Sequence, residues 1–426
     1  MSGITFDPSE YIRGLQQILV SDKKKIGFLC GAGTSLAKKN RNSITVPSIS
    51  VMTEDICKKL EEKSDNKIVL TEIKKEIEDQ GEIFNIESLL SNIEQKIRVI
   101  GCGTLNKIKK RQFEELYKEI KNEIKLKVNV HQKILEGDNI ANLIHLDFAE
   151  WIGRTARVHP IEIFTTNYDY LFELGLEHNN VPFYDGFTGC YQPFFYPESI
   201  DNMKFLPEQT KLWKIHGSLG WHLNKKTKKV VRQDSDDLDI LIYPSSLKYD
   251  SSKKQPYTAL MDRLTSFLKE PDTVLITIGY SFGDEHINDR IMSALSSNTS
   301  THVLALYYDS FLEKNIKRYS LNFDSDLAIL AKSNGKLSVF GCRTAIIGGK
   351  LGKWKLKRKP DKNDFLNIDT YFDSDAPIDI EVSIDTEKIG EEQWSGEGEL
   401  VLPKFEKFVG FLQAMIVNND LFEFSK

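Results

Sequence analysis

Four short segments carry residues whose types and positions could do chemistry. Each follows a short apolar run, and in chain order they are Gly31–Ser35, Thr165–Asp169, His216–Gly217 and Gly279–Asp284. Glycines after a strand allow backbone N–H groups to approach a pyrophosphate that a side chain would exclude. Asn167 can hold a ribose hydroxyl or a water in a fixed orientation. His216 is suited to act as a general base near neutral pH.

Each segment also has a plainer interpretation. The Gly31-Ala32-Gly33 turn lacks the third glycine of the usual dinucleotide fingerprint, because Leu36 stands at the sixth position. Asp169 and Asp284 are suited to cap helices over 170–176 and 285–295. A lone histidine is more often structural than catalytic. The combination is more informative, because the carboxyl ends of parallel strands meet at one edge of a sheet.

The apolar runs predict an α/β fold whose parallel sheet is covered on both faces. The expected strands are 26–30, 161–165, 212–215, 239–243, 273–278, 301–307 and 337–340. Between them, the proline-free stretch from Ser48 to His159 has apolar residues at helical spacing, which predicts a large helical insertion. The expected organisation is a first part of the α/β domain at 1–52, the insertion at 53–159, the remainder at 160–349 and a C-terminal appendage at 350–426.

Composition narrows the class of protein. The chain has 426 residues, a net charge of -5 and a pI near 6.0, which argues against a dedicated nucleic-acid binder. It shows no signal peptide and no apolar stretch of about 20 residues, so a cytoplasmic location without membrane contact is expected. The five scattered cysteines form no C-x-x-C pair, so no metal site is expected. An amphipathic stretch over 405–424 in the appendage is suited to packing or assembly.

Together the four segments resemble the sirtuin (silent information regulator) family, and more closely its bacterial anti-phage branch. Gly31–Ser35 is similar to the family's G-A-G-x-S loop, and 164–169 to its T-N-x-D segment. His216-Gly217 is similar to its His-Gly pair, and 279–288 to a loop of the bacterial branch. The resemblance covers roughly residues 20–345 and implies a Rossmann-like, sirtuin-type sheet that binds NAD.

The resemblance also implies roles for individual residues. Asn167 and His216 would be catalytic, with Asn167 orienting a water or a ribose hydroxyl and His216 acting as the base. The residues expected to bind the dinucleotide are Gly31, Ala32, Gly33, Thr34, Ser35, Thr166, Asp169, Gly279, Ser281 and Phe282.

Two departures from the deacylating sirtuins shape the expected activity. Only Pro47-Ser48 is similar to their G-I-P-D-F-R stretch, and their four-cysteine zinc module has no counterpart here. The expected activity is therefore hydrolysis of NAD+ to nicotinamide and ADP-ribose. By resemblance, this enzyme would deplete NAD in abortive-infection defence against phage and assemble as a homo-oligomer, with a HerA-type ATPase as a candidate partner.

Two alternatives stay open at this point. One is a non-catalytic subunit that senses NAD or ADP-ribose and gates a partner, and the other is an ADP-ribosyltransferase. The sequence also leaves open the activating trigger, the oligomer size, the choice between NAD and NADP and the role of the appendage.

Overall fold

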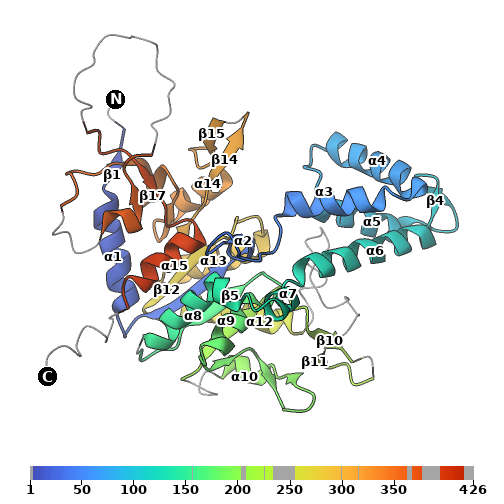
Figure 1. Ribbon diagram of the computed structural model, residues 1–426, viewed down its shortest axis with the longest axis horizontal. Helices are drawn as coiled ribbons and strands as arrows, with labels where there is room; N and C mark the ends of the chain where they lie inside the picture. Colours follow the sequence, from blue (N-terminus) through green and yellow to red (C-terminus); the bar gives the residue numbers. More distant parts are fainter. Residues whose placement is uncertain are drawn as a thin grey trace, which may run out of the picture.

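A ten-stranded, mainly parallel sheet forms the centre of the computed structural model (Figure 1). The structure describes residues 3–155, 157–202, 208–224, 226–233, 255–298, 300–314, 316–361, 367–376 and 394–416. In spatial order the strands of this sheet are β1 (Thr5–Phe6), β18 (Lys350–Trp354), β17 (Thr344–Ile347), β16 (Leu337–Phe340), β13 (His302–Leu306), β12 (Thr273–Ile278), β2 (Lys25–Cys30), β5 (Glu162–Thr165), β9 (Thr210–Lys214) and β6 (Phe183–Tyr184).

The strand order gives the Rossmann-like topology. When β2, β5, β9, β12, β13 and β16 are numbered along the chain, their order in the sheet is 3-2-1-4-5-6, with all neighbours in this set parallel. The predicted α/β fold with a parallel sheet is therefore confirmed. The strand order reverses between β2 and β12, and ligands of open α/β sheets bind at this point.

Helices cover both faces of the sheet. On one face lie α1 (Pro8–Val20), α8 (Ile144–Arg154), α9 (Leu171–His178) and α15 (Phe405–Gln413); on the other lie α12 (Tyr257–Lys269), α13 (Glu285–Ser297) and α14 (Asp326–Ser333). Successive strand residues alternate between the two cores. Phe28 of β2 packs edge-on against Phe148 of α8, with ring centroids 5.2 Å apart, whereas Leu29 belongs to the core under α12. Burial on both faces explains the uninterrupted apolar runs.

A separate helical lobe projects to one side of the sheet (Figure 1). It consists of α3 (Ile49–Leu60), α4 (Ser64–Asp79), α5 (Ile86–Val99), α6 (Lys110–Val128) and the short α7 (His131–Glu136), with its own apolar core. The helical spacing predicted for 86–93 is confirmed, since Ile86, Leu89, Leu90 and Ile93 are all buried. The start of α5 is tied to α3 because the Ile86 amide donates to Thr53 Oγ1 at 2.9 Å.

Smaller elements complete the described structure. A four-stranded sheet contains β10 (Trp221–Leu223), β11 (Val230–Arg232), β8 (Phe194–Phe195) and β7 (Phe187–Thr188). The two-stranded pairs are β14 (Ser310–Glu313) with β15 (Ile316–Tyr319), β19 (Phe372–Asp373) with β20 (Glu399–Leu400), and β3 (Thr104–Leu105) with β4 (Ile108–Lys109). The short helices are α2 (Ala32–Leu36) and α10 (Glu198–Asp201), with 3-10 turns at Ile140–Asn142 and Ile368–Thr370.

The C-terminal helix α15 packs into the main core. Its Phe405 and Phe408 are buried in the cluster that also holds Phe28 and Phe148. Of the predicted amphipathic stretch 405–424, residues 417–424 lie outside the described residues, as does the predicted strand 239–243. The boundaries at 52, 159 and 349 stay predictions. Among the described helices, none is both long enough and apolar enough to cross a membrane.

One buried histidine makes the stability of this core depend on pH. His145 of α8 is 1% exposed and lies between the rings of Phe172 and Phe405, at centroid distances of 4.7 and 5.2 Å. Neither ring nitrogen has a hydrogen-bond partner among the described residues. Burial lowers the pKa of His145 to about 4, because a charged imidazole without partners is costly in an apolar core.

We expect this histidine to destabilise the fold in acid. Between pH 6.5 and about 4 the unfolded chain binds a proton at His145 that the folded protein does not, so the free energy of unfolding falls as the pH falls. The loss at pH 4.5 should be on the order of 2–3 kcal/mol. Urea unfolding at pH 7.5 and 4.5 should show a smaller pH dependence for His145→Phe than for wild type. The exposed His178→Gln serves as control, and equal pH dependence in all three proteins would contradict the prediction.

Candidate functional site

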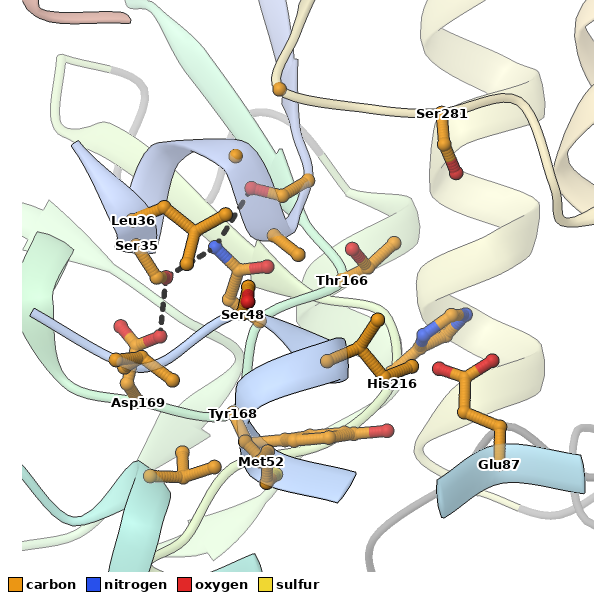
Figure 2. A pocket seen from close by; sticks show the side chains of 18 of the residues that line it. Ser35, Leu36, Ser48, Met52, Glu87, Thr166, Tyr168, Asp169, His216 and Ser281 are labelled. Atoms are coloured by element: carbon orange, nitrogen blue, oxygen red, sulfur yellow. Dashed lines mark hydrogen bonds between the residues drawn. The ribbon is translucent and has the colours of Figure 1, made fainter. Parts of the chain in front are cut away.

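A cavity of about 510 Å³ opens at the carboxyl edge of the sheet, where the strand order reverses (Figure 2). Its volume lies within the range of pockets that hold small ligands. Its walls come from the loops that follow β2, β5, β9 and β12, and from the helical lobe. The residues expected from sequence to do chemistry therefore meet, although they are spread over about 250 positions of the chain.

The loops after β2 and β12 contact each other backbone to backbone. The Gly33 amide donates to the Gly279 carbonyl at 2.9 Å, and the Gly31 amide donates to the Ile278 carbonyl at 3.1 Å. A Cβ on Gly33 would lie 2.6 Å from Gly279 Cα, and one on Gly279 would lie 2.6 Å from the Thr34 amide nitrogen. Gly279 also has a φ of +63°, which disfavours other residues. These glycines are thus required by the contact between the two loops.

The Asn167 side chain is fixed by the first glycine loop. Its Nδ2 lies 2.7 Å from Ser35 Oγ and 3.0 Å from both Thr34 Oγ1 and the Gly31 carbonyl. Ser35 Oγ in turn donates to Asp169 Oδ2 at 2.5 Å. The amide nitrogen is therefore the atom turned toward the loop, which orients the whole carboxamide. Asn167 itself is buried, at 7% exposure.

Asp169 and Lys214 form further hydrogen bonds that stabilise this arrangement. Asp169 Oδ1 accepts a hydrogen bond from the Leu171 amide at 3.1 Å, but the N-cap residue of α9 is Tyr170, one position later than the predicted cap. Lys214, at the end of β9, donates to the Asp169 carbonyl and to Glu173 Oε1, the latter at 2.7 Å. Burial nevertheless raises the pKa of Glu173, because desolvation outweighs the attraction of the lysine.

His216 is paired with a carboxylate from another loop. Its Nε2 lies 3.1 Å from Asp284 Oδ2, and both side chains are about nine-tenths buried. Asp284 Oδ1 accepts hydrogen bonds from the amides of His286 and Ile287, so the predicted cap of α13 is confirmed. One carboxylate thus caps a helix and also fixes the orientation of the histidine ring. A carboxylate beside a histidine stabilises the protonated ring.

The helical lobe forms the opposite wall of the cavity. This wall is mainly apolar, and its lobe residues are Ile49, Met52, Ile86, Glu87, Leu90, Ile124 and Val128. In Figure 2 Met52 lies beside Tyr168, and the Glu87 carboxylate points toward the His216 ring. Sequence reasoning missed these residues, because helical spacing identifies a buried face without showing which neighbour covers it. It also missed the Asp284–His216 pair, since the capping pattern accounted for Asp284.

The structure brings most of the predicted site residues to this cavity. Those that line it are Gly31, Ala32, Gly33, Ser35, Thr166, Asn167, Asp169, His216, Gly279 and Ser281. Two do not. Thr34 is completely buried beneath the loop and donates to the Gly31 carbonyl at 2.8 Å. Phe282 packs against Tyr280, with ring centroids 4.9 Å apart, and is not among the residues that line the cavity. The functional roles of all twelve stay predictions.

Comparison with known families agrees with this geometry. Residues 161–328 match the family model of the SIR2-like domain. The match supports a sirtuin-like family for this chain. It covers β5 to α14, and so includes Asn167, His216 and the loop after β12, whereas Gly31–Ser35 precedes it. No curated protein matches the chain.

SIR2-like domains bind NAD and are typically NAD-dependent enzymes. The match therefore points to an activity related to NAD. Within the described residues, no group of three or more His, Cys, Asp or Glu side chains is placed to hold a metal ion.

Substitution of Gly279 should test the loop contact. Gly279→Ala places a methyl group against the Gly33–Thr34 backbone at a positive φ, so the free energy of unfolding should fall by about 2 kcal/mol or more. Gly14→Ala is the control: the added methyl group has no neighbour within 4 Å and lies within α1. This change should raise stability by about 0.5–1 kcal/mol. Urea unfolding measures both, and a neutral Gly279→Ala would contradict the loop contact.

Proposed function

We propose that this protein is an NAD+ hydrolase that releases nicotinamide and ADP-ribose. The observation that supports this most directly is that Asn167 and His216, from two different strand ends, line one cavity at the point where the strand order reverses. The SIR2-like match over the same strands adds independent support. The hydroxyl groups of Thr166 and Ser281 line the cavity and are suited to ribose and phosphate oxygens.

In the proposed reaction, water replaces nicotinamide at the ribose carbon. The carbon–nitrogen bond breaks, its electron pair stays on the ring nitrogen, and nicotinamide leaves as a neutral molecule. Asn167, held by the Ser35 and Thr34 hydroxyls, orients the water or a ribose hydroxyl. His216 removes the proton from the attacking oxygen and passes it to solvent. General base catalysis of this kind typically contributes about 10²–10⁴ in rate.

Two features of the environment around His216 favour this reaction. Asp284, 3.1 Å from His216 Nε2, orients the ring and stabilises it once it has taken the proton. The apolar wall from the lobe, including Met52 and Leu90, displaces bulk water around the reacting groups. Charges act over longer distances in such a site because the local dielectric is low.

The biological role is a further part of the proposal. Depletion of NAD in anti-phage defence, assembly of several copies and a HerA-type ATPase partner rest on the sirtuin resemblance, whereas a cytoplasmic location rests on the hydropathy pattern of the sequence. The alternatives, an NAD sensor and an ADP-ribosyltransferase, use the same cavity but differ in the fate of the ADP-ribose group.

Substitution of the two proposed catalytic residues should abolish nicotinamide release. Asn167→Ala removes the orienting amide and His216→Ala removes the base, so each should lower kcat by about 10²-fold or more. Chromatography of NAD+, nicotinamide and ADP-ribose after incubation measures the reaction, with and without a candidate ATPase. His222→Ala is a control, since this partly exposed histidine of β10 is not among the residues that line the cavity.

The products separate the proposal from its alternatives. Free ADP-ribose in equal amount to nicotinamide supports hydrolysis. Nicotinamide release with ADP-ribose attached to a macromolecule would instead identify a transferase. NAD+ that binds and stays intact even after prolonged incubation with the activated complex would favour a sensor.

A further inference from the structure

The ionisable groups of the cavity are arranged asymmetrically. Among the described residues that line it, the carboxylates are Glu87, Asp169 and Asp284, and the histidine is His216. Asp169 and Asp284 belong to the sheet edge, and both oxygens of each accept hydrogen bonds or contact the histidine within the protein. Glu87 comes from the helical lobe, and its carboxylate points toward the His216 ring from the opposite wall (Figure 2).

The position of Glu87 is built into the fold. It stands in the first turn of α5, where Asn85 Oδ1 accepts hydrogen bonds from the amides of Glu87 and Ser88, at 2.8 and 3.0 Å. The Ser88 hydroxyl accepts one in return from the Asn85 amide at 2.9 Å. This capping box fixes the first turn of the helix. The bond from Ile86 to Thr53 fixes the same turn against α3.

Glu87 also lies at the boundary between two neighbouring cavities. Glu87, Gly283 and Asp284 line both the main cavity and a second one of about 550 Å³ between the starts of α5 and α13. Asp284 contacts His216, so this boundary lies next to the proposed reacting groups. An extended ligand that occupies both cavities has to pass beside the Glu87 carboxylate.

We infer that Glu87 is a specificity-determining residue that selects the oxidised, positively charged nicotinamide ring over its neutral reduced form. The inference rests on the proposed function and adds the residue that selects its substrate. The nicotinamide of NAD+ carries a positive charge that NADH lacks, and the reacting end of the dinucleotide must lie near His216. A carboxylate on the facing wall attracts the cationic ring and gives the neutral ring no such advantage.

The test compares binding of NAD+ and NADH to the full chain by isothermal titration calorimetry. Asn167→Ala is present in every sample to keep NAD+ intact. Adding Glu87→Gln, which preserves shape but removes the charge, should raise the Kd for NAD+ roughly tenfold and change the Kd for NADH less than about twofold. Glu87→Asp retains the charge and should keep the preference for NAD+, which guards against a misfolded glutamine variant.

A matched control lies on the same helix. Glu94 of α5 pairs with Arg98 at 3.3 Å and is not among the residues that line the cavity, so Glu94→Gln should leave both Kd values unchanged. Equal weakening of NAD+ and NADH by Glu87→Gln, or no weakening of either, would overturn the inference while NAD+ binding by the parent preserves the proposed function. If neither the Asn167→Ala parent nor the wild-type protein binds NAD+, the proposed function is overturned, and the inference with it.

Discussion

The backbone contact between the loops after β2 and β12 is the constraint on which the site depends. At the Gly33–Gly279 hydrogen bond the two halves of the sheet meet, and the strand order reverses there. Asn167 takes its orientation from the Gly31–Ser35 loop, and His216 takes its own from Asp284 in the loop after β12. Each loop therefore holds one of the two proposed catalytic side chains, and their mutual contact fixes the relative position of these two supports.

This contact changes the meaning of the glycine pattern. In the sequence, a glycine pair after a strand suggests room for a phosphate. In the structure, the Cβ positions of Gly31 and Gly33 point at the Gly279 backbone. The two glycines are therefore explained by the close approach of the loop after β12. Ala32 and Ser35 line the cavity. A glycine pattern in a sequence indicates that the backbone lies close to another group. It does not say whether that group is a ligand or another part of the chain.

The predictions from the sequence were most accurate for the elements that depend on local residue patterns. The bounds of β12 and β16 agree with the predicted runs, because strands buried on both faces are continuously apolar and end at turn residues. The antiparallel strands β17 and β18 were not predicted, since their partly exposed residues give no such run. The Asp284–His216 pair and the lobe wall also escaped prediction. Both join segments far apart in the chain, and only the assembled fold brings them together.

The helical lobe does more than cover the cavity, because it packs on the loops that carry the proposed catalytic residues. Tyr168, between Asn167 and Asp169, packs against the core of the lobe, and Leu219, three residues after His216, is buried in it. The Leu219 amide donates to the Tyr168 carbonyl at 3.1 Å, which joins the two loops under the lobe. Within each loop, one side chain faces the cavity and a near neighbour anchors in the lobe. The sheet edge supplies the proposed reacting groups, and the packing of the lobe fixes the positions of both loops. The geometry of the site therefore depends on the core of the sheet domain and on the core of the lobe together.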